Sequence, residues 1–323
     1  MRLSLIIPVY NSEPWLARCL DSVLAQSFRD YECICVNDGS GDASAQILTK
    51  YAGLDPRIKI IDFPENRGVC AARNAGLDLA TGDYIYFMDS DDWIDSDLLE
   101  SLLAQAEKTA QDIVINANYV EEHEADSKRA FSSDFGFLDL APAYYAPDLV
   151  QWKFPPVLWA RLYRRSFLEK EKIRFPYLLA GTEDIYFTGL AETLQEKSFV
   201  FRGPYYHYFQ RAGSLLHQKE HGFWNIVSFE KLYRSWQEKG VETENLRLFY
   251  AGPMTIDSQE TFDRIRPFLA EIAPQVKRHP EKYVALDRFL LDAVCGSADY
   301  AAFRARYNPN IAIAFVRSKL KPL

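Results

Sequence analysis

Short apolar runs alternate with helical patterns over the first third of the chain, and this alternation constrains the fold more than any other feature. The runs that read as strands are residues 3–9, 31–37, 57–63, 84–88 and 112–118. Helical patterns separate them, and the first of these follows Ser12, a residue suited to capping, and has an apolar side made of Trp15, Leu16, Cys19, Leu20, Val23 and Leu24. Strands that alternate with helices usually pair in parallel, because each helix returns the chain across the sheet. The sequence therefore predicts an α/β fold with a mostly parallel sheet flanked by helices.

The rest of the chain divides into three parts. Residues 119–155 have no clear period, which is typical of a functional loop or an insertion on the acceptor side. A second structured block follows and ends on an aromatic strand, "PYYHYFQ", at 204–210. From about residue 220 helical patterns dominate, and Gly240 suits the end of a helix. We predict a main domain over 1–218 and a C-terminal helical extension over 219–323.

Composition excludes several classes of protein. The net charge of -8 argues against a nucleic-acid partner, which normally requires a basic surface. The five cysteines form no CxxC pair, so we expect reduced thiols. Pro8 and Asn11 interrupt the first apolar run before it reaches the length of a signal peptide, and no run reaches the roughly 18 residues of a membrane helix. We expect a cytoplasmic location.

The stretch "YIYFMDSDDWID" (84–95) ends an apolar run on crowded acids. Carboxylates at the carboxyl end of a parallel strand lie where open α/β sheets bind ligands. Their hard oxygens suit Mg²⁺ or Mn²⁺, which would make the clustered charge favourable. The alternative is that such acids only end the strand and start the next helix. We assign Asp89 and Asp91 to a ligand and a metal, and Asp92 and Asp95 to the start of the helix.

Three further stretches carry polar residues at or near the ends of predicted strands. They are "PVYN" (8–11), "VNDGSGD" (36–42) and "ENRGVCAARNAG" (65–76). Tyr10 can present a ring to a ligand, and Asp38 can accept the imide N–H of a pyrimidine base. Arg73 can stack on a base or reach a phosphate. Each stretch also has a plain interpretation, as a strand-to-helix turn, an Asp-Gly turn and a surface charge.

The stretch "AGTEDIYF" (180–187) places two acids at the start of a helical pattern. Acidic residues are favoured there by the helix dipole, so Glu183 and Asp184 can be a simple capping pair. The functional interpretation is a general base that the second block delivers to the site.

Taken together and in this order, the quoted stretches resemble the family 2 glycosyltransferases, which have the GT-A fold. The resemblance runs from residue 3 to about 120 and from about 157 to 216. It implies metal-dependent, inverting transfer of a sugar from a nucleotide-sugar to a hydroxyl of a glycan or lipid-linked acceptor in surface polysaccharide synthesis. A UDP-sugar is the favoured donor, because Asp38 suits uracil, although thymine presents the same imide edge. The fold implied is a Rossmann-like mixed sheet with a helical extension.

The resemblance also implies roles for individual residues. Contacts to the nucleotide are implied for Pro8, Tyr10, Asp38, Asn66, Arg73, Asp89, Ser90 and Asp91. Asp91, with Asp89, is the implied ligand of Mn²⁺ or Mg²⁺. Asp184 is the implied general base, with Glu183 beside it.

The stretch "YHYFQRAGSLLHQ" departs from the family pattern. Arg211 and Ser214 fit positions that face the diphosphate, but Phe209 stands where many relatives have Arg. His207 and His217 are either metal or phosphate contacts or structural residues.

Other functions remain open. A haloacid dehalogenase would place its acids on the first strand, and a glycoside hydrolase would not require the nucleotide-like stretches. The alternative from another class is a non-catalytic binding subunit of a polysaccharide assembly complex. From Tyr300 onward the chain has basic residues and no acid, so this tail is either a peripheral membrane contact or a packed amphipathic helix.

Overall fold

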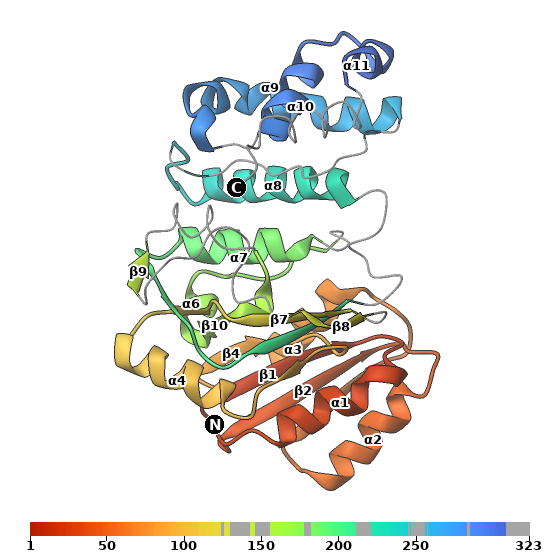
Figure 1. Ribbon diagram of the computed structural model, residues 1–323, viewed down its shortest axis with the longest axis vertical. Coiled ribbons are helices and arrows are strands. Elements are labelled where there is room, and N and C mark those ends of the chain that lie inside the picture. Colours follow the sequence, from red (N-terminus) through yellow and green to blue (C-terminus); the bar gives the residue numbers. More distant parts are fainter. Residues whose placement is uncertain are drawn as a thin grey trace. The chain divides into compact units, whose positions relative to one another are not determined.

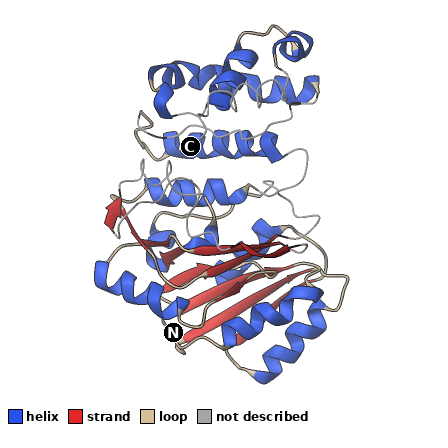
Figure 2. Cartoon of the chain, in the orientation of Figure 1, coloured by secondary structure: helices blue, strands red, loops and turns tan. Residues whose placement is uncertain are grey.

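The structure is a computed structural model, and it describes most of the chain (Figures 1 and 2). The described residues are 1–123, 126–129, 143–145, 156–177, 182–210, 221–244, 246, 256, 258–282 and 285–307. The chain divides into two compact units, Met1–Ala212 and Gly213–Leu323. The boundary predicted at 218/219 lies outside the described residues.

A sheet of eight strands, counted over the described residues, forms the centre of the N-terminal unit. Its members are β1 (Leu3–Val9), β2 (Tyr31–Asp38), β3 (Ile58–Phe63), β4 (Tyr84–Phe87), β6 (Ile113–Asn116), β9 (Ala143–Tyr145), β10 (Arg161–Arg164) and β11 (Ser198–Phe201). Their spatial order is β3-β2-β1-β4-β10-β6-β11-β9. The first four are parallel, and β10 is antiparallel to both β4 and β6. The predicted α/β fold is confirmed, and the sheet is mixed.

Helices cover both faces of this sheet (Figure 1). They are α1 (Glu13–Leu24), α2 (Ser44–Leu54), α3 (Val69–Leu79), α4 (Leu98–Thr109), α6 (Arg165–Lys170), α7 (Glu183–Thr193) and the short 3₁₀ helix η1 (Leu158–Ala160). Leu5 and Ile7 of β1 share a core with Leu16 of α1. Ile6 points to α3, where a Cβ on Gly76 would collide with its side chain. Glycine at 76 therefore lets α3 approach the sheet closely.

A second sheet has four strands in the described part of the chain, in the order β5-β12-β7-β8. They are β5 (Trp93–Ile94), β7 (Tyr119–His123), β8 (Asp126–Arg129) and β12 (Tyr206–Gln210). The aromatic strand predicted near the end of the second block is confirmed as β12. The prediction of irregular structure over 119–155 is wrong for the residues of β7, β8 and β9. β7 pairs with β12, which is distant in sequence, so no local pattern announces it.

The helix predicted from residue 95 begins only at Leu98, because Trp93 and Ile94 pair with β12 as β5. On α1 the predicted apolar side is only partly buried. Leu16, Cys19, Leu20 and Val23 are buried, whereas Trp15 and Leu24 are intermediate.

The described residues of the C-terminal unit are mainly helical, as predicted. Its helices are α8 (His221–Glu238), α9 (Gln259–Arg278), the short η3 (Pro280–Lys282), α10 (Ala285–Cys295) and α11 (Tyr300–Arg306). Gly240 follows α8 with φ +68°, a conformation that glycine adopts readily. Among the described residues, no helix combines the length and apolar character that crossing a membrane requires. The basic tail after Tyr307 lies outside them.

Candidate active site

Residues predicted for the site gather at the carboxyl ends of three adjacent parallel strands, β2, β1 and β4 (Figure 1). Pro8 belongs to β1, and Tyr10 follows that strand with 47% of its surface exposed. Asp38 ends β2, and Asp89 comes shortly after β4. The fold thus brings these segments to the one sheet edge where open α/β sheets bind ligands.

Asp38 holds the turn that precedes α3. Its two carboxylate oxygens accept the backbone N–H groups of Arg67 (2.7 Å) and Gly68 (2.9 Å), and the residue is buried. Gly39 has φ +68°, and a Cβ there would collide with the backbone of Asn66. The end of β2 therefore fixes the position of Asn66. Each oxygen of Asp38 can still accept a further hydrogen bond, as contact with a base would require.

The turn after β1 is bound to its neighbours. Asn11 accepts the N–H of Gly41 at 2.8 Å. Ser12 stands at the N-cap of α1 but makes no side-chain capping bond. Its hydroxyl instead lies 2.7 Å from that of Ser90, and this contact ties α1 to the acidic stretch.

Arg73 joins acids from two separate motifs. It lies on α3 and is 4% exposed. Its Nη1 donates to Glu183 at 2.5 Å and to Asp184 at 3.2 Å, and its Nη2 donates to Asp89 at 2.9 Å. One buried guanidinium therefore connects the start of α7 with the end of β4. We call these four residues the Arg73 cluster.

The cluster changes the acid–base behaviour of its members. Burial, with the nearby charges of Glu183 and Asp89, raises the pKa of Asp184 to about 8 against the opposing effect of Arg73. Burial lowers the pKa of Arg73, but its three acidic neighbours outweigh burial and raise it. The Asp184 side chain is 26% exposed, so a substrate can reach it. A carboxyl whose pKa is raised in this way can take up a proton near neutral pH, which suits a general base.

Aromatic rings pack next to the Arg73 cluster, and the guanidinium carbon of Arg73 lies 5.5 Å from the centre of the Phe175 ring. Phe175 stacks on Phe187 of α7 at 4.2 Å, and Phe87 of β4 meets both rings edge-on. Asn74 binds the backbone of Phe175 twice, through its Nδ2 (2.8 Å) and its Oδ1 (3.0 Å). Sequence reasoning missed this role, although Asn74 directly follows Arg73 in the same motif.

Two acids of the "DSDDWID" stretch do not start the helix that follows. Asp92 is fully buried and accepts hydrogen bonds from the Tyr206 hydroxyl and, at 2.7 Å, from the Phe209 N–H. Asp95 accepts the N–H of Tyr205 at 2.8 Å. The helix-start prediction for both is therefore wrong, because their partners lie on and just before β12. The N-cap position of α4 is taken by Asp97.

Asp89 and Asp91 fit a divalent cation only in part. Both are half-buried at the end of β4, and Asp89 also binds Arg73. The described residues contain no group of three or more His, Cys, Asp or Glu side chains placed to hold a metal. This donor set suits Mg²⁺ or Mn²⁺, which is often bound by one or two protein carboxylates and completed by substrate phosphates.

Of the residues singled out in "YHYFQRAGSLLHQ", the structure describes His207 and Phe209. His207 stacks on Trp93 with ring centroids 5.0 Å apart, and its Nε2 lies 2.9 Å from Asp95. These contacts are those of a structural histidine. Arg211, Ser214 and His217 lie outside the described residues.

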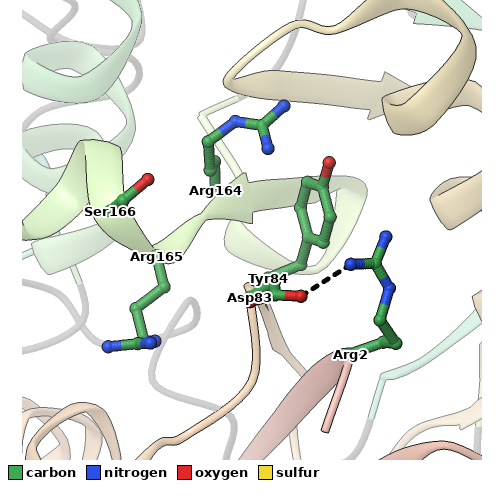
Figure 3. Close-up of a pocket in the computed structure, with 6 residues that line it drawn as sticks. All are labelled: Arg2, Asp83, Tyr84, Arg164, Arg165 and Ser166. Carbon is green, nitrogen blue, oxygen red and sulfur yellow. Dashed lines mark hydrogen bonds and ion pairs between the residues drawn. The ribbon is translucent and has the colours of Figure 1, made fainter.

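A pocket of about 140 Å³ lies where β1 and β4 begin and the antiparallel β10 ends, at the opposite ends of the strands from the site. Figure 3 shows its lining residues. It is lined by Arg2, Asp83, Tyr84, Arg164, Arg165 and Ser166. Its arginines bind acids of the protein: Arg2 binds Asp83 at 2.7 Å, Arg164 binds Asp112 at 2.9 Å and Arg165 binds Glu169 at 2.6 Å. Because these charges are satisfied internally, we do not take this pocket as the active site.

Known proteins resemble this chain in sequence. Residues 4–170 match the family model described as Glycosyl transferase family 2. EpsH of Bacillus subtilis is 38% identical over 210 residues, which cover 64% of this chain and 60% of EpsH. The poly(ribitol-phosphate) beta-glucosyltransferase of Bacillus spizizenii is 33% identical over 217 residues, which cover 66% of this chain and 33% of that protein. The chain thus spans less than two thirds of the length of either relative.

A solved structure resembles it in fold. The crystal structure of S. aureus TarS 1–349 in complex with UDP-GlcNAc matches with a TM-score of 0.76 at 20% identity. The match covers 100% of this chain and 93% of the TarS chain. At this identity the likeness shows the fold, in agreement with the mixed α/β architecture described above.

Proposed function

We propose that this chain, which belongs to glycosyltransferase family 2 and has the GT-A fold, transfers a sugar from a nucleotide-sugar to an acceptor hydroxyl with inversion at the sugar carbon. The TarS complex contains UDP-GlcNAc, which supports a UDP-sugar as the donor. A relative named as a poly(ribitol-phosphate) beta-glucosyltransferase supports a polymer hydroxyl as the acceptor.

The observation that carries the proposal is the Arg73 cluster. It sets Asp184 in contact with Arg73, which also binds Asp89 at the end of β4. An inverting reaction needs a proton acceptor on the side of the sugar carbon opposite the departing diphosphate. Asp184, with a pKa of about 8, provides that acceptor.

Each member of the cluster has a distinct task in this proposal. Asp184 takes the proton of the acceptor hydroxyl as that oxygen attacks the sugar carbon. Arg73 holds the Asp184 carboxylate in place. Glu183 places negative charge next to Asp184 and so increases its affinity for a proton. Attack occurs on the side opposite the departing diphosphate, and the configuration therefore inverts.

The donor would be bound by the strand ends. In this proposal Pro8, Tyr10, Asp38 and Asn66 surround the nucleoside. Asp89, Ser90 and Asp91 would contact the ribose and the diphosphate, a role that the family resemblance also implies for Arg211. Asp91 and Asp89 would hold Mn²⁺ or Mg²⁺, which when bound supplies positive charge that stabilises the departing diphosphate.

We propose that the acceptor is a glycan or a lipid-linked glycan in surface polysaccharide synthesis. The reaction would take place on the cytoplasmic face of the membrane, with the basic residues after Tyr300 as the peripheral contact.

The test is the rate of UDP release from UDP-GlcNAc and other UDP-sugars, with Mn²⁺ or with EDTA, in the wild type and in Asp184→Asn. We expect Asp184→Asn to lower turnover by about 1,000-fold, because general-base catalysis contributes on this scale. UDP binding by calorimetry should change little. Asp83→Asn, at the opposite ends of the strands from the site, is the matched control and should retain full activity.

Full activity in Asp184→Asn would rule out this residue as the base. A wild-type chain that binds UDP but releases none from any UDP-sugar would instead be a non-catalytic binding subunit.

A further inference from the structure

Arg18 reaches from the exposed side of α1 to the segment that carries Asp91. Its Nη2 donates to the backbone carbonyl of Asp91 at 3.2 Å. Its guanidinium carbon lies 3.5 Å from the centre of the Trp93 ring and 4.8 Å from that of Phe209. The planar guanidinium thus stacks on an aromatic ring and donates a hydrogen bond at once, a combination that lysine cannot reproduce.

The two rings beneath Arg18 are themselves held in place. Trp93 stacks on His207 with an interplanar angle of 12°, and the backbone N–H of Phe209 binds Asp92. Both His207 and Phe209 belong to β12. Arg18 therefore rests on a surface that the second sheet makes rigid.

The residues on either side of Asp91 have anchors of their own. Ser90 contacts Ser12, and Asp92 binds β12. The contact from Arg18 adds an anchor at Asp91, through its backbone carbonyl. Arg18 lies within reach of the charges of Glu122, Asp92 and Asp91, and its hydrogen bond goes to the backbone carbonyl of Asp91.

We propose that Arg18 is a positioning residue that orients the Asp91 carboxylate toward the donor diphosphate and its cation. This inference rests on the proposed function, because it requires Asp91 to bind that cation. Arg18 acts through Asp91 and does not take part in the chemistry.

The experiment measures UDP binding to the full chain by isothermal titration calorimetry, with Mn²⁺ and with EDTA. We expect Arg18→Ala to weaken the binding of UDP with Mn²⁺ by about tenfold, because residues that orient metal ligands contribute on this scale. Binding in EDTA should be unchanged. Arg18→Lys keeps the charge but not the stacked, hydrogen-bonded geometry, and should show most of the same loss.

Arg57→Ala is the matched control. Arg57 also lies over an aromatic ring, at 4.3 Å from the centre of Tyr31, and it pairs with the Asp55 carboxylate. It lies before β3, at the amino ends of the parallel strands and away from the site. This variant should bind UDP as the wild type does in both conditions. Circular dichroism and thermal melts show whether each variant is folded. If Arg18→Ala is not folded, the binding of UDP to Arg18→Lys tests the proposal instead.

Asp91→Asn separates this inference from the proposed function. If Arg18 acts through Asp91, adding Arg18→Ala to Asp91→Asn should cause no further loss. Two results would overturn the role of Arg18 and leave the metal assignment intact. In the first, Mn²⁺ strengthens UDP binding in Arg18→Ala but not in Asp91→Asn. In the second, Mn²⁺ strengthens UDP binding equally in Arg18→Lys and in the wild type. If the wild type binds UDP equally well with Mn²⁺ and with EDTA, both the metal assignment and this inference are contradicted.

Discussion

Single carboxylates in this chain differ in what surrounds them. Asp184 is partly exposed, and burial together with acidic neighbours raises its pKa to about 8. Asp92 is fully buried, and burial first and then Asp91 and Asp89 raise its pKa well above the usual value. Asp92 is enclosed and bound to β12, whereas Asp184 can meet both solvent and substrate. Of these two carboxyls, Asp184 is therefore the one that combines a raised pKa with access to an acceptor.

The pKa of Asp184 predicts how turnover depends on pH. A general base works in its deprotonated form, and a carboxyl with a pKa of about 8 is protonated below that value. The rate at low acceptor concentration should therefore fall by about tenfold for each pH unit well below 8 and level off above it. The measurement is the initial rate of UDP release between pH 6 and pH 9.5.

Glu183→Gln tests the cause of this profile. Removing the Glu183 charge should lower the pKa of Asp184, so the acidic limb should move to lower pH. A wild-type rate that is constant from pH 6 to pH 9 would contradict the assignment of Asp184.

At the scale of elements, the acidic stretch serves both sheets. Asp89 binds Arg73. Asp92 binds β12, and Asp95 binds the residue just before that strand. β12 pairs with β5 and β7, so these carboxylates fasten the second sheet to the end of β4. The wrong helix-start prediction for Asp92 and Asp95 has this origin, since a capping pattern is local and β12 is distant in sequence.

Removal of the Asp92 carboxylate should loosen β12. Asp92→Ala leaves the Phe209 N–H and the Tyr206 hydroxyl buried without their acceptor, so the free energy of unfolding should fall by about 3 kcal/mol. Asp92→Asn retains one acceptor oxygen and should lose less. Urea unfolding followed by tryptophan fluorescence measures both changes.

Asp97→Ala is the control for this comparison. Asp97 occupies the N-cap position of α4 without a side-chain capping bond, so the change should be within about 0.5 kcal/mol. A loss in Asp92→Ala no larger than that in Asp97→Ala would contradict the role of Asp92 as an anchor of β12.

The stability of the whole molecule depends on a buried acid far from the site. Glu32 of β2 is fully buried and accepts hydrogen bonds from Ser4 (2.6 Å), Lys59 (2.6 Å) and the backbone of Thr81 (2.7 Å). It thus connects β1, β2 and β3 with the turn before β4. Burial opposes its ionisation, but these hydrogen bonds prevail and lower its pKa to about 2.

This shift predicts a loss of stability in acid. The folded pKa of about 2 is below the ordinary value of 4.5, so the contribution is complete above pH 4.5 and is lost as the pH falls toward 2. Glu32→Gln should lower the free energy of unfolding by about 3 kcal/mol at pH 7, and its difference from the wild type should shrink below pH 4.5. Urea unfolding at pH 7 and pH 3 measures this. A difference as large at pH 3 as at pH 7 would refute the prediction, and Glu107→Gln, on an exposed ion pair, is the control.

The sequence by itself determined the parallel strands β1 to β4, the helices between them and the segments that meet at their carboxyl ends. These features follow from local periods and turn residues, and a parallel sheet necessarily brings the ends of its strands together. Only the tertiary structure decided which side chains become partners there. Arg73 meets Glu183, Asp92 meets β12 and Arg18 meets Asp91 because segments distant in sequence pack against one another, and no local period records such contacts.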